Sequence, residues 1–358
     1  MNSDVIKGKL VLEDGSVFYG LSFGSAVSKA GEVVFNTGMV GYPEALTDPS
    51  YKGQILVLTY PLVGNYGVPS DEIEHGLKKN FESDSIHVQG LIISDYCEKP
   101  HHWNSAKTLS KWLNEYGIPS LYGIDTRELT KKLREKGTML GRIEINDKIK
   151  DEDPNERNLV ADVSCRERQV YGKSKKRIVL VDCGAKNNII RCLLKRNVEV
   201  IRVPWDYDFN KENADGIVIS NGPGDPKQAK ETIENLRIAM EAEKPIFGIC
   251  LGNQLLALAS GGDTYKLKYG HRSQNQPCIM KGTKRCFITS QNHGYAVNTK
   301  SLSGKWEEWF VNANDNTNEG IRHKSKPFMS VQFHPEACPG PKDTEFLFDE
   351  FLKVIANG

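Results

Sequence analysis

Short apolar runs alternate with helical patterns through the second half of the chain, and this alternation restricts the fold more than any other feature. Strands are predicted at residues 177–184, 198–203, 216–220 and 245–249, and helices at 186–196 and 228–243. Strands that alternate with helices through short turns form a doubly wound, mostly parallel sheet. Functional residues of such sheets lie at the carboxyl ends of the strands.

One of these strand ends carries the sequence Gly248-Ile-Cys-Leu-Gly252, followed by a Leu/Ala-rich helical pattern. The arrangement matches the G-x-S-x-G nucleophile elbow, with Cys250 in the serine position. Glycines flank the nucleophile because only glycine avoids a clash on so tight a turn. The N-terminus of the next helix would favour a thiolate and a developing oxyanion. The alternative is a buried structural cysteine.

A cysteine nucleophile needs a base, and the base needs a group that orients it. His334 follows a predicted strand, and Glu336, two residues later, would lie on the same face of the chain. His293, in the polar segment 290–295 that is predicted to be a loop, is the rival base. The pair His101–His102 has no third ligand nearby, so no metal site is expected.

The turn Asn221-Gly-Pro-Gly-Asp-Pro226 follows a neighbouring strand and should face the same crevice as Cys250. It can be a plain tight turn, or its backbone N–H groups can bind a carbonyl oxygen or a carboxylate. The chain contains neither a Walker A loop nor a Gly-x-Gly-x-x-Gly motif, so we expect no ATP or dinucleotide in it.

The first part of the chain, residues 1–147, is predicted to be a mixed α/β domain without a nucleophile–base pair of its own. Strand-like runs flank Asp14-Gly15, which is a hairpin signal, and helices are expected from Ser105 and from Asp125. Residues 148–176 are charged and weakly periodic, which predicts a linker. The second domain would then span residues 177–358.

The composition excludes several classes of protein. The chain has 358 residues, which fits two globular domains. Its net charge of +1 gives no excess of positive charge that would indicate binding to nucleic acid or to an anionic membrane. No apolar run is long enough to span a membrane, and the first residues lack a signal or transit pattern. The eight cysteines form no Cys-x-x-Cys pair, so we expect reduced thiols and a cytoplasmic location.

The elbow, the His334–Glu336 pair and the 221–226 turn resemble the class I glutamine amidotransferases. The segments at 291–295, 41–51 and 123–131 narrow this resemblance to the glutaminase (small) subunit or domain of carbamoyl-phosphate synthetase. The likeness covers nearly the full chain and is closest to eukaryotic forms. It implies an N-terminal docking and tunnel domain before a doubly wound amidotransferase domain.

The resemblance implies that the chain hydrolyses glutamine to glutamate and ammonia through a γ-glutamyl thioester. Cys250 would attack the amide, His334 would move the protons, and Glu336 would orient His334. The N–H of Leu251 and one from the 222–224 turn would hold the oxyanion. The residues implied to bind glutamine are Ser50, Gly222, Gly224, Leu251, Gln254, Asn292, Gly294 and Tyr295.

The implied partner is a large synthetase subunit, or fused synthetase domains, that makes carbamoyl phosphate from bicarbonate, ammonia and ATP. ATP and magnesium are expected on that partner, and no cofactor or metal is expected in this chain. Pyrimidine and arginine biosynthesis both stay open as pathways. The alternatives are a docking or regulatory subunit with little glutaminase activity and a stand-alone γ-glutamyl hydrolase.

The chain departs from the family at two positions. The family's elbow commonly reads Cys-Leu-Gly-His-Gln, but Asn253 stands in the histidine position here. Asparagine at this position is similar to the ammonia-dependent relatives, which have also lost the cysteine, and so it implies a slower glutaminase. Tyr295 replaces a common phenylalanine and adds a hydroxyl group.

Overall fold

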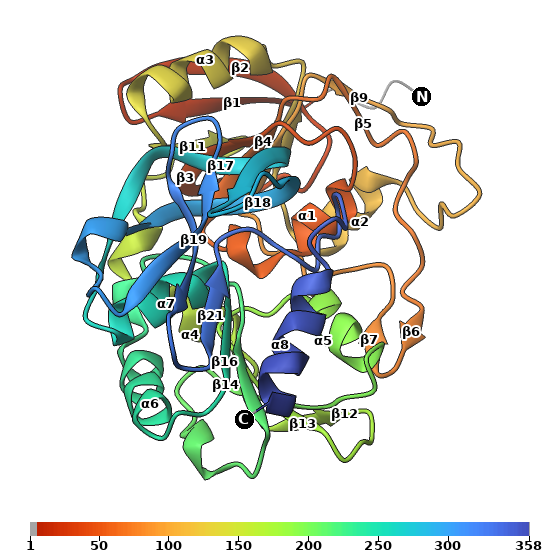
Figure 1. Ribbon diagram of the computed structural model, residues 1–358. Helices are drawn as coiled ribbons and strands as arrows, with labels where there is room; N and C mark the ends of the chain where they lie inside the picture. Colours follow the sequence, from red (N-terminus) through yellow and green to blue (C-terminus); the bar gives the residue numbers. More distant parts are fainter. Residues whose placement is uncertain (1–5, 358) are drawn as a thin grey trace. The chain divides into compact units, whose positions relative to one another are not determined.

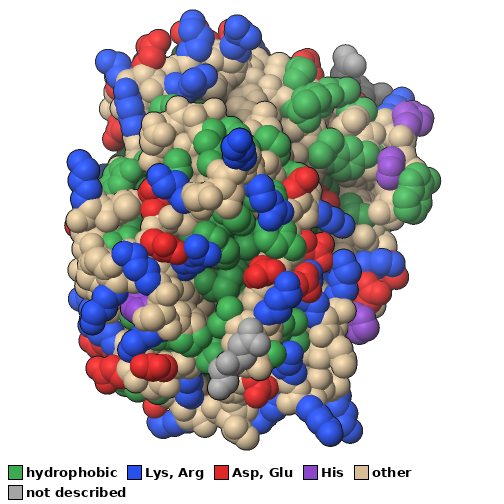
Figure 2. Space-filling model, viewed as in Figure 1, with side chains coloured by type: hydrophobic (Ala, Val, Ile, Leu, Met, Phe, Trp, Pro, Cys, Tyr) green, Lys and Arg blue, Asp and Glu red, His purple; other side chains and the backbone are tan. Residues whose placement is uncertain are grey.

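The computed structural model describes residues 6–357, and they form two compact units. The first unit holds the described residues up to Glu74 together with Lys78–Glu156, and the second holds His75–Leu77 and the chain from Arg157 onward. Lys and Arg side chains are interspersed with Asp and Glu over the face drawn in Figure 2, in keeping with the small net charge.

The first unit is built on a closed barrel with the strand order β1-β11-β3-β4-β8-β10-β2. The barrel strands are β1 (Lys7–Leu12), β2 (Val17–Ser22), β3 (Lys29–Asn36), β4 (Gln54–Leu58), β8 (Gly90–Ile92), β10 (Ser120–Tyr122) and β11 (Met139–Glu144). Strands β1 and β2 pair antiparallel around Asp14-Gly15, which confirms the predicted hairpin. The unit also contains the short strands β5 (Leu62–Val63), β6 (Ile73–Glu74) and β9 (Asp95–Tyr96).

The helices of this unit are α1 (Tyr42–Thr47), α2 (Leu109–Glu115) and α3 (Thr126–Lys136). Helix α3 begins as predicted, because the Asp125 side chain accepts a hydrogen bond from the Glu128 N–H. The predicted start of α2 at Ser105 is wrong. The backbone at Ala106 and Lys107 pairs with Val68, so the helix begins only at Leu109, after the cap at Thr108.

The second unit is built on a ten-stranded sheet with the order β12-β14-β13-β15-β16-β21-β20-β19-β17-β18. Its parallel strands are β13 (Arg177–Asp182), β14 (Glu199–Pro204), β15 (Gly216–Ile219), β16 (Ile246–Ile249) and β21 (Phe328–Val331). The antiparallel strands are β12 (Gln169–Tyr171), β17 (Asp263–Met280), β18 (Cys286–Asn298), β19 (Trp306–Asn312) and β20 (Asn318–His323). The parallel part confirms the predicted doubly wound sheet.

Alternate residues of the parallel strands enter two different cores, one on each face of the sheet. On one face, Ile178, Leu180 and Phe247 pack with residues of α5 (Asn187–Leu194) and α8 (Phe346–Asn357). On the other face, Val179 and Ile217 pack with residues of α6 (Lys230–Glu241) and α7 (Leu251–Ala259). Figure 1 shows these helix pairs on opposite sides of the strands. Burial on both faces explains why these strands are continuous apolar runs.

The remaining elements are short. The segment predicted to be a linker, residues 148–176, contains helix α4 (Leu159–Val163) and strand β12, which pairs with β14 at the edge of the sheet. The other short elements are β7 (Leu77–Lys78) and the 3-10 helices η1 (Pro49–Tyr51), η2 (Pro154–Glu156), η3 (Phe209–Lys211), η4 (Pro226–Gln228) and η5 (Thr299–Ser301).

The predicted polar loop at 290–295 is a strand segment instead. It lies in β18 and pairs with β17, with His293 opposite His271 and Gln291 opposite Ser273. The side chains of Gln291, Asn292 and His293 are buried, which an alternating apolar pattern cannot reveal. Each of them has polar neighbours that make this burial possible.

Candidate active site

Cys250 lies at the junction of β16 and α7 in a backbone conformation that non-glycine residues rarely adopt. Its φ is 56° and its ψ is −102°. A Cβ atom on Gly248 would lie 2.4 Å from the Gly252 carbonyl oxygen, and one on Gly252 would lie 2.3 Å from the Ile219 carbonyl oxygen. The junction therefore needs glycine on both sides, as the elbow motif predicts.

The strand β21 brings a second polar segment beside the elbow. It runs parallel to β16, with Ile249 opposite Val331, and the Cys250 N–H donates to the Val331 carbonyl oxygen at 2.8 Å. The next residue, Gln332, lies with its Nε2 3.7 Å from the Cys250 Sγ. Parallel pairing thus places residues 332–336 at the same sheet edge as the cysteine.

His334 and Glu336 form a buried pair at this edge. The His334 Nδ1 lies 2.6 Å from the Glu336 Oε1, and both side chains are almost fully buried. The other ring nitrogen of His334, Nε2, is buried and makes no hydrogen bond within the described part of the chain. The pair has the geometry of a base whose tautomer and orientation are fixed by a carboxylate.

The charges at this pair favour the imidazolium form of His334. Burial alone would lower the pKa of His334, but the Glu336 carboxylate and the Cys250 sulfur outweigh burial and raise that pKa to about 10. Burial alone would raise the pKa of Glu336, but Lys186 and His334 lower it to about 2. A thiolate at Cys250 would complete this set of charges.

Lys186 is the contact that the sequence analysis missed. Its Nζ lies 3.2 Å from the Glu336 Oε1 and also donates to the Ala337 carbonyl oxygen, and the side chain is buried. The Asn188 side chain donates to the Glu336 carbonyl oxygen. The available signal was position, because Lys186 follows the carboxyl end of β13.

The turn after β15 lies against the start of α7. A Cβ on Gly222 would lie 2.1 Å from the Cys183 carbonyl oxygen and 2.8 Å from a methyl carbon of Leu251, so only glycine fits. Gly224 has a φ of 82°, which also favours glycine. The predicted residues of this turn and the elbow are therefore neighbours, while their contact with a ligand stays a prediction.

The residues predicted to bind glutamine fall into two groups. In the second unit, the Gln254 Nε2 donates to the Tyr295 carbonyl oxygen at 2.9 Å, and the Cys250 Sγ lies 3.7 Å from the Asn292 carbonyl oxygen. Gly294 lies between Asn292 and Tyr295 on β18. Ser50 lies in the first unit, where its N–H donates to Asp48, and its role stays a prediction.

Asn253 is fully buried in an uncharged network. Its amide nitrogen lies 3.2 Å from the Gln332 Oε1, and its oxygen accepts from the Ser330 hydroxyl at 2.8 Å. Gln332 also accepts from Gln254 at 3.1 Å. Asn253 thus reaches Cys250 through Gln332, and its effect on the rate stays a prediction.

His293, the rival base, has both ring nitrogens near other partners. Nδ1 lies 2.8 Å from the Tyr295 carbonyl oxygen and Nε2 lies 3.1 Å from the Gln291 Oε1. Burial and the neighbouring His271 keep the pKa of His293 well below its usual value. The Cys250 sulfur is one of the groups that raise the pKa of His334, whereas both ring nitrogens of His293 face other partners, so His334 is the better-placed base.

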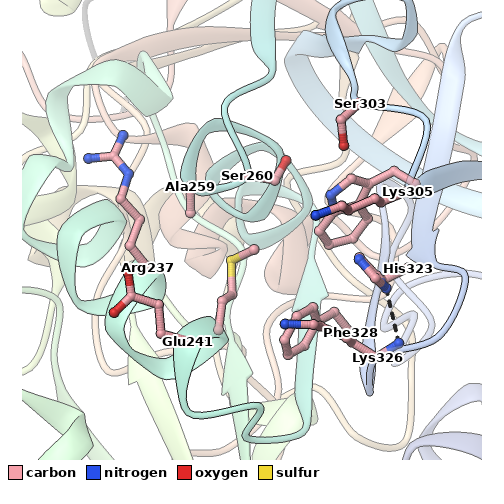
Figure 3. A pocket seen from close by; sticks show the side chains of 11 residues that line it. Arg237, Glu241, Ala259, Ser260, Ser303, Lys305, His323, Lys326 and Phe328 are labelled. Carbon is pink, nitrogen blue, oxygen red and sulfur yellow. Dashed lines mark hydrogen bonds between the residues drawn. The ribbon is translucent and has the colours of Figure 1, made fainter.

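A basic pocket of about 390 Å³ lies elsewhere in the second unit. Figure 3 shows Arg237, Lys305 and Lys326 around it, with Phe328 in its wall. The pocket also contains Ala259, at the end of α7 opposite to Cys250. Since an α-helix rises 1.5 Å per residue, the nine residues of α7 separate the two places by about 13 Å. This pocket is therefore distinct from the candidate active site.

Comparison with known families divides the chain in the same way. Residues 10–143 match the family described as carbamoyl-phosphate synthase small chain, CPSase domain. Residues 179–354 match the family glutamine amidotransferase class-I. Within residues 6–357, no helix has the length and apolar character needed to cross a membrane.

Three curated relatives match nearly the whole chain. They are "Multifunctional protein CAD" of Squalus acanthias (57% identity over 97% of this chain), "Multifunctional protein pyr1-3" of Dictyostelium discoideum (52% over 98%), and "Carbamoyl-phosphate synthase [ammonia], mitochondrial" of Homo sapiens (52% over 98%). The chain spans only 16%, 17% and 24% of the lengths of these relatives. Each of them is therefore a much longer protein than the sequence described here.

Proposed function

The chain belongs to the carbamoyl-phosphate synthase small-chain family and carries a class-I glutamine amidotransferase domain, and we propose from this premise that it hydrolyses glutamine at Cys250. The observation that carries the proposal is the strained Cys250 elbow beside the buried His334–Glu336 pair. A nucleophile, an oriented base and a nearby helix N-terminus are the parts that acyl transfer from an amide requires.

Before glutamine is attacked, the Cys250 thiol gives its proton to His334, and the raised pKa of His334, about 10, keeps that proton on the imidazole. The sulfur attacks the side-chain carbonyl carbon of glutamine and forms a tetrahedral intermediate. The oxyanion would be held by the N–H of Leu251 and an N–H of the 222–224 turn. His334 then gives its proton to the departing nitrogen, the C–N bond breaks, and ammonia leaves behind a γ-glutamyl thioester.

In the second half, water attacks the thioester carbon and His334 accepts the proton of that water. The C–S bond breaks, the sulfur leaves as a thiolate, glutamate is released, and the proton stays on His334. Glu336 stays ionised throughout, because Lys186 and His334 lower its pKa to about 2. Its role is to hold the imidazole ring and to stabilise the imidazolium. The proposed glutamine contacts are Gln254, Asn292, Gly294, Tyr295, Gly222, Gly224, Leu251 and Ser50.

We further propose that the ammonia passes to a carbamoyl-phosphate synthetase subunit or domain. The names of the relatives support this proposal. One of them is a carbamoyl-phosphate synthase, and its match covers 98% of this chain. Bicarbonate and ATP would react on that partner and not on this chain. The pathway served would be pyrimidine or arginine biosynthesis.

Glutamate release tests the hydrolytic step. Cys250→Ser should abolish release, whereas Cys183→Ala, which removes another buried thiol of the same sheet, should leave it near the wild-type rate. Acid quenching during turnover should trap a γ-glutamyl adduct on the wild-type chain. The Cys250→Ser chain should carry no such adduct. Equal release by wild type and Cys250→Ser would show that Cys250 is not the nucleophile.

Ammonia delivery needs a separate test. The chain is mixed with a synthetase subunit, and glutamine labelled with ¹⁵N in its amide is supplied together with unlabelled ammonium. The ¹⁵N label from glutamine should enter carbamoyl phosphate in preference to nitrogen from the unlabelled ammonium in solution. The alternative, a docking subunit with weak glutaminase activity, predicts tight binding to the partner with no label transfer.

A further inference from the structure

A second cluster of histidine and carboxylate groups lies in the antiparallel half of the sheet. His271 on β17 pairs with His293 on β18, and their rings meet edge to face with centroids 5.0 Å apart. Glu319, near the start of β20, lies beside them. All three side chains are more than nine-tenths buried, and one ligand atom from each lies within 4.8 Å of the others.

In each histidine one ring nitrogen lies beside an acceptor, so the other ring nitrogen is the one that could bind a metal ion. The His271 Nε2 lies 2.8 Å from the Asp315 Oδ2, and the His293 Nδ1 lies 2.8 Å from the Tyr295 carbonyl oxygen. A proton on the His293 Nδ1 would be accepted by this carbonyl oxygen and would leave a lone pair on Nε2. Metal-binding histidines are oriented in this way, by a carboxylate or a carbonyl on the nitrogen away from the metal.

The inward-facing atoms have few partners. Neither the His271 Nδ1 nor the Glu319 Oε2 makes a hydrogen bond within the described part of the chain. The His271 Nδ1 lies 3.4 Å from the Glu319 Oε1, close to the ~3.3 Å that separates two ligands of a tetrahedral zinc ion. The His293 Nε2 lies 3.1 Å from the Gln291 Oε1, so in this tautomer two acceptor atoms would face each other. A cation between them would relieve this repulsion.

We propose that His271, His293 and Glu319 form a binding site for a divalent transition metal ion, with zinc as its best-matched occupant. Two imidazole nitrogens and one carboxylate oxygen are a ligand set for zinc and not for calcium or magnesium, which prefer oxygen alone. Asp315 and the Tyr295 carbonyl are the orienting groups, and the Gln291 oxygen or a water molecule is the fourth ligand. Small side-chain rotations that move the ligand atoms by about 1 Å would bring all of them within bonding distance of one metal ion.

The charges of the cluster also favour an added cation. Two carboxylates, Asp315 and Glu319, face a single histidine, and no lysine or arginine forms an ion pair with either of them among the described residues. A divalent ion would balance both carboxylates. Asp315 is 43% exposed and provides access from the β19–β20 turn.

The position of the cluster suggests what the metal would do. Asn292, which precedes His293 on β18, has its carbonyl oxygen 3.7 Å from the Cys250 Sγ. A metal bound at His293 would fix this strand segment beside the elbow. The proposed site is therefore structural, and its effect on glutamine would appear in the KM more than in the kcat.

Metal binding is measured on the full 358-residue chain carrying Cys250→Ser, so that the active-site thiol cannot bind the ion. Zinc affinity is obtained by competition with a chromophoric chelator, and cobalt is used as a spectroscopic probe. One equivalent should bind, with visible cobalt bands typical of low coordination number and without a thiolate charge-transfer band. Zinc should also raise the thermal midpoint.

The variants decide between a metal site and a metal-free hydrogen-bond network. His271→Asn should weaken zinc binding at least 100-fold, and Asp315→Asn, at a partly exposed position that tolerates change, by about tenfold. His323→Asn, at a histidine of β20 outside the cluster, is the matched control and should bind as the parent does. Parent-like affinity in both His271→Asn and Asp315→Asn, or no stoichiometric binding in the parent, would overturn the proposal.

Discussion

Two buried histidine–carboxylate clusters lie in the same sheet, one in its parallel half and one in its antiparallel half, and they differ in charge balance. At the elbow, His334 and Lys186 carry two positive charges against the one carboxylate of Glu336. In the other cluster, His271 carries one positive charge against the two carboxylates of Asp315 and Glu319. Counted over these named groups alone, the first cluster has one positive charge in excess and the second has one negative charge in excess.

This difference indicates what each cluster is built to hold. At the elbow, a group of the chain itself can balance the charge of His334, because the Cys250 sulfur is one of the groups that raise the pKa of His334. The missing positive charge of the second cluster has no such source among the described residues. Buried charges are stable only when they are balanced, so the second cluster needs a proton or a metal ion from solution.

The largest effect is expected from Glu336→Gln, which removes the carboxylate that pairs with both Lys186 and His334. Lys186 and His334 would then both lose this buried carboxylate. We expect kcat/KM for glutamine to fall by about 10³–10⁴, because His334 loses its orienting group. The free energy of unfolding should fall by about 3 kcal/mol, which is the usual cost of leaving a buried charge unpaired.

Steady-state glutamate release and urea unfolding measure these two quantities. The control is Glu350→Gln, at an exposed ion pair with Lys353, which should change stability by less than about 1 kcal/mol. A Glu336→Gln chain that keeps more than a tenth of the wild-type activity would show that charge balance at the elbow does not matter for catalysis.

The next effect concerns Lys186, whose removal should shift the acid limit of stability. Because the pKa of Glu336 is about 2 in the folded chain and 4.5 when unperturbed, its contribution is present above pH 4.5 and is lost as the pH falls toward 2. Lys186→Met removes the largest group that lowers this pKa, so the contribution should be smaller and its loss should be complete at a higher pH. Acid unfolding followed by circular dichroism measures the midpoint.

Lys195→Met is the matched control, because Lys195 forms an exposed ion pair with Glu345. Its acid midpoint should equal that of the wild type. An unchanged midpoint in Lys186→Met would mean that His334 alone keeps Glu336 ionised.

The two halves of the sheet also differ in how far the sequence predicts them. The parallel strands are apolar on both faces, so their runs at 177–182, 216–219 and 246–249 are visible without any structure. The elbow and the His334–Glu336 pair follow from such strands, because each lies just beyond a strand end. Lys186 was missed, since its partner is 150 residues away and no local pattern connects the two.

The antiparallel half is harder to predict because its buried face is polar. Strand β18 places Gln291 and His293 inside the protein, where they are stabilised by hydrogen bonds to Thr289 and Tyr295. Such a segment has no apolar alternation and is predicted as a loop. The cluster of His271, His293 and Glu319 depends on strand pairing between segments far apart in sequence, which composition and spacing do not reveal.

A further prediction concerns the charge states of the three buried histidines. At pH 7.5, His334 and His271 should be imidazolium ions, because their pKa values are raised to about 10 and about 9. His293 should be neutral with its proton on Nδ1, because burial and His271 lower its pKa. Nitrogen-15 chemical shifts of the imidazole rings measure all three states.

The sign of the pH dependence follows from these directions. The stability that His271 contributes is complete below pH 6.5 and is lost as the pH rises through about 9. His293 acts in the opposite direction, since its protonation opposes folding below pH 6.5. His271→Asn should therefore remove the alkaline loss, while His323→Asn should leave it. A neutral His271 at pH 7.5 in the metal-free chain would contradict the charge balance inferred for the second cluster.

The smallest effect is expected at Asn253, whose network beside the elbow carries no charge. In Asn253→Ala, the Gln332 oxygen keeps its bond from Gln254, and the Ser330 hydroxyl keeps the Ile321 carbonyl at 3.3 Å. We expect a loss of about 1–2 kcal/mol in stability, typical of a buried amide, and a change in kcat of less than tenfold. Gln332→Ala should lower kcat more, because Gln332 contacts the Cys250 sulfur directly. If Asn253→Ala lowers kcat as much as Glu336→Gln does, the neutral network beside the elbow controls catalysis as strongly as the buried charges.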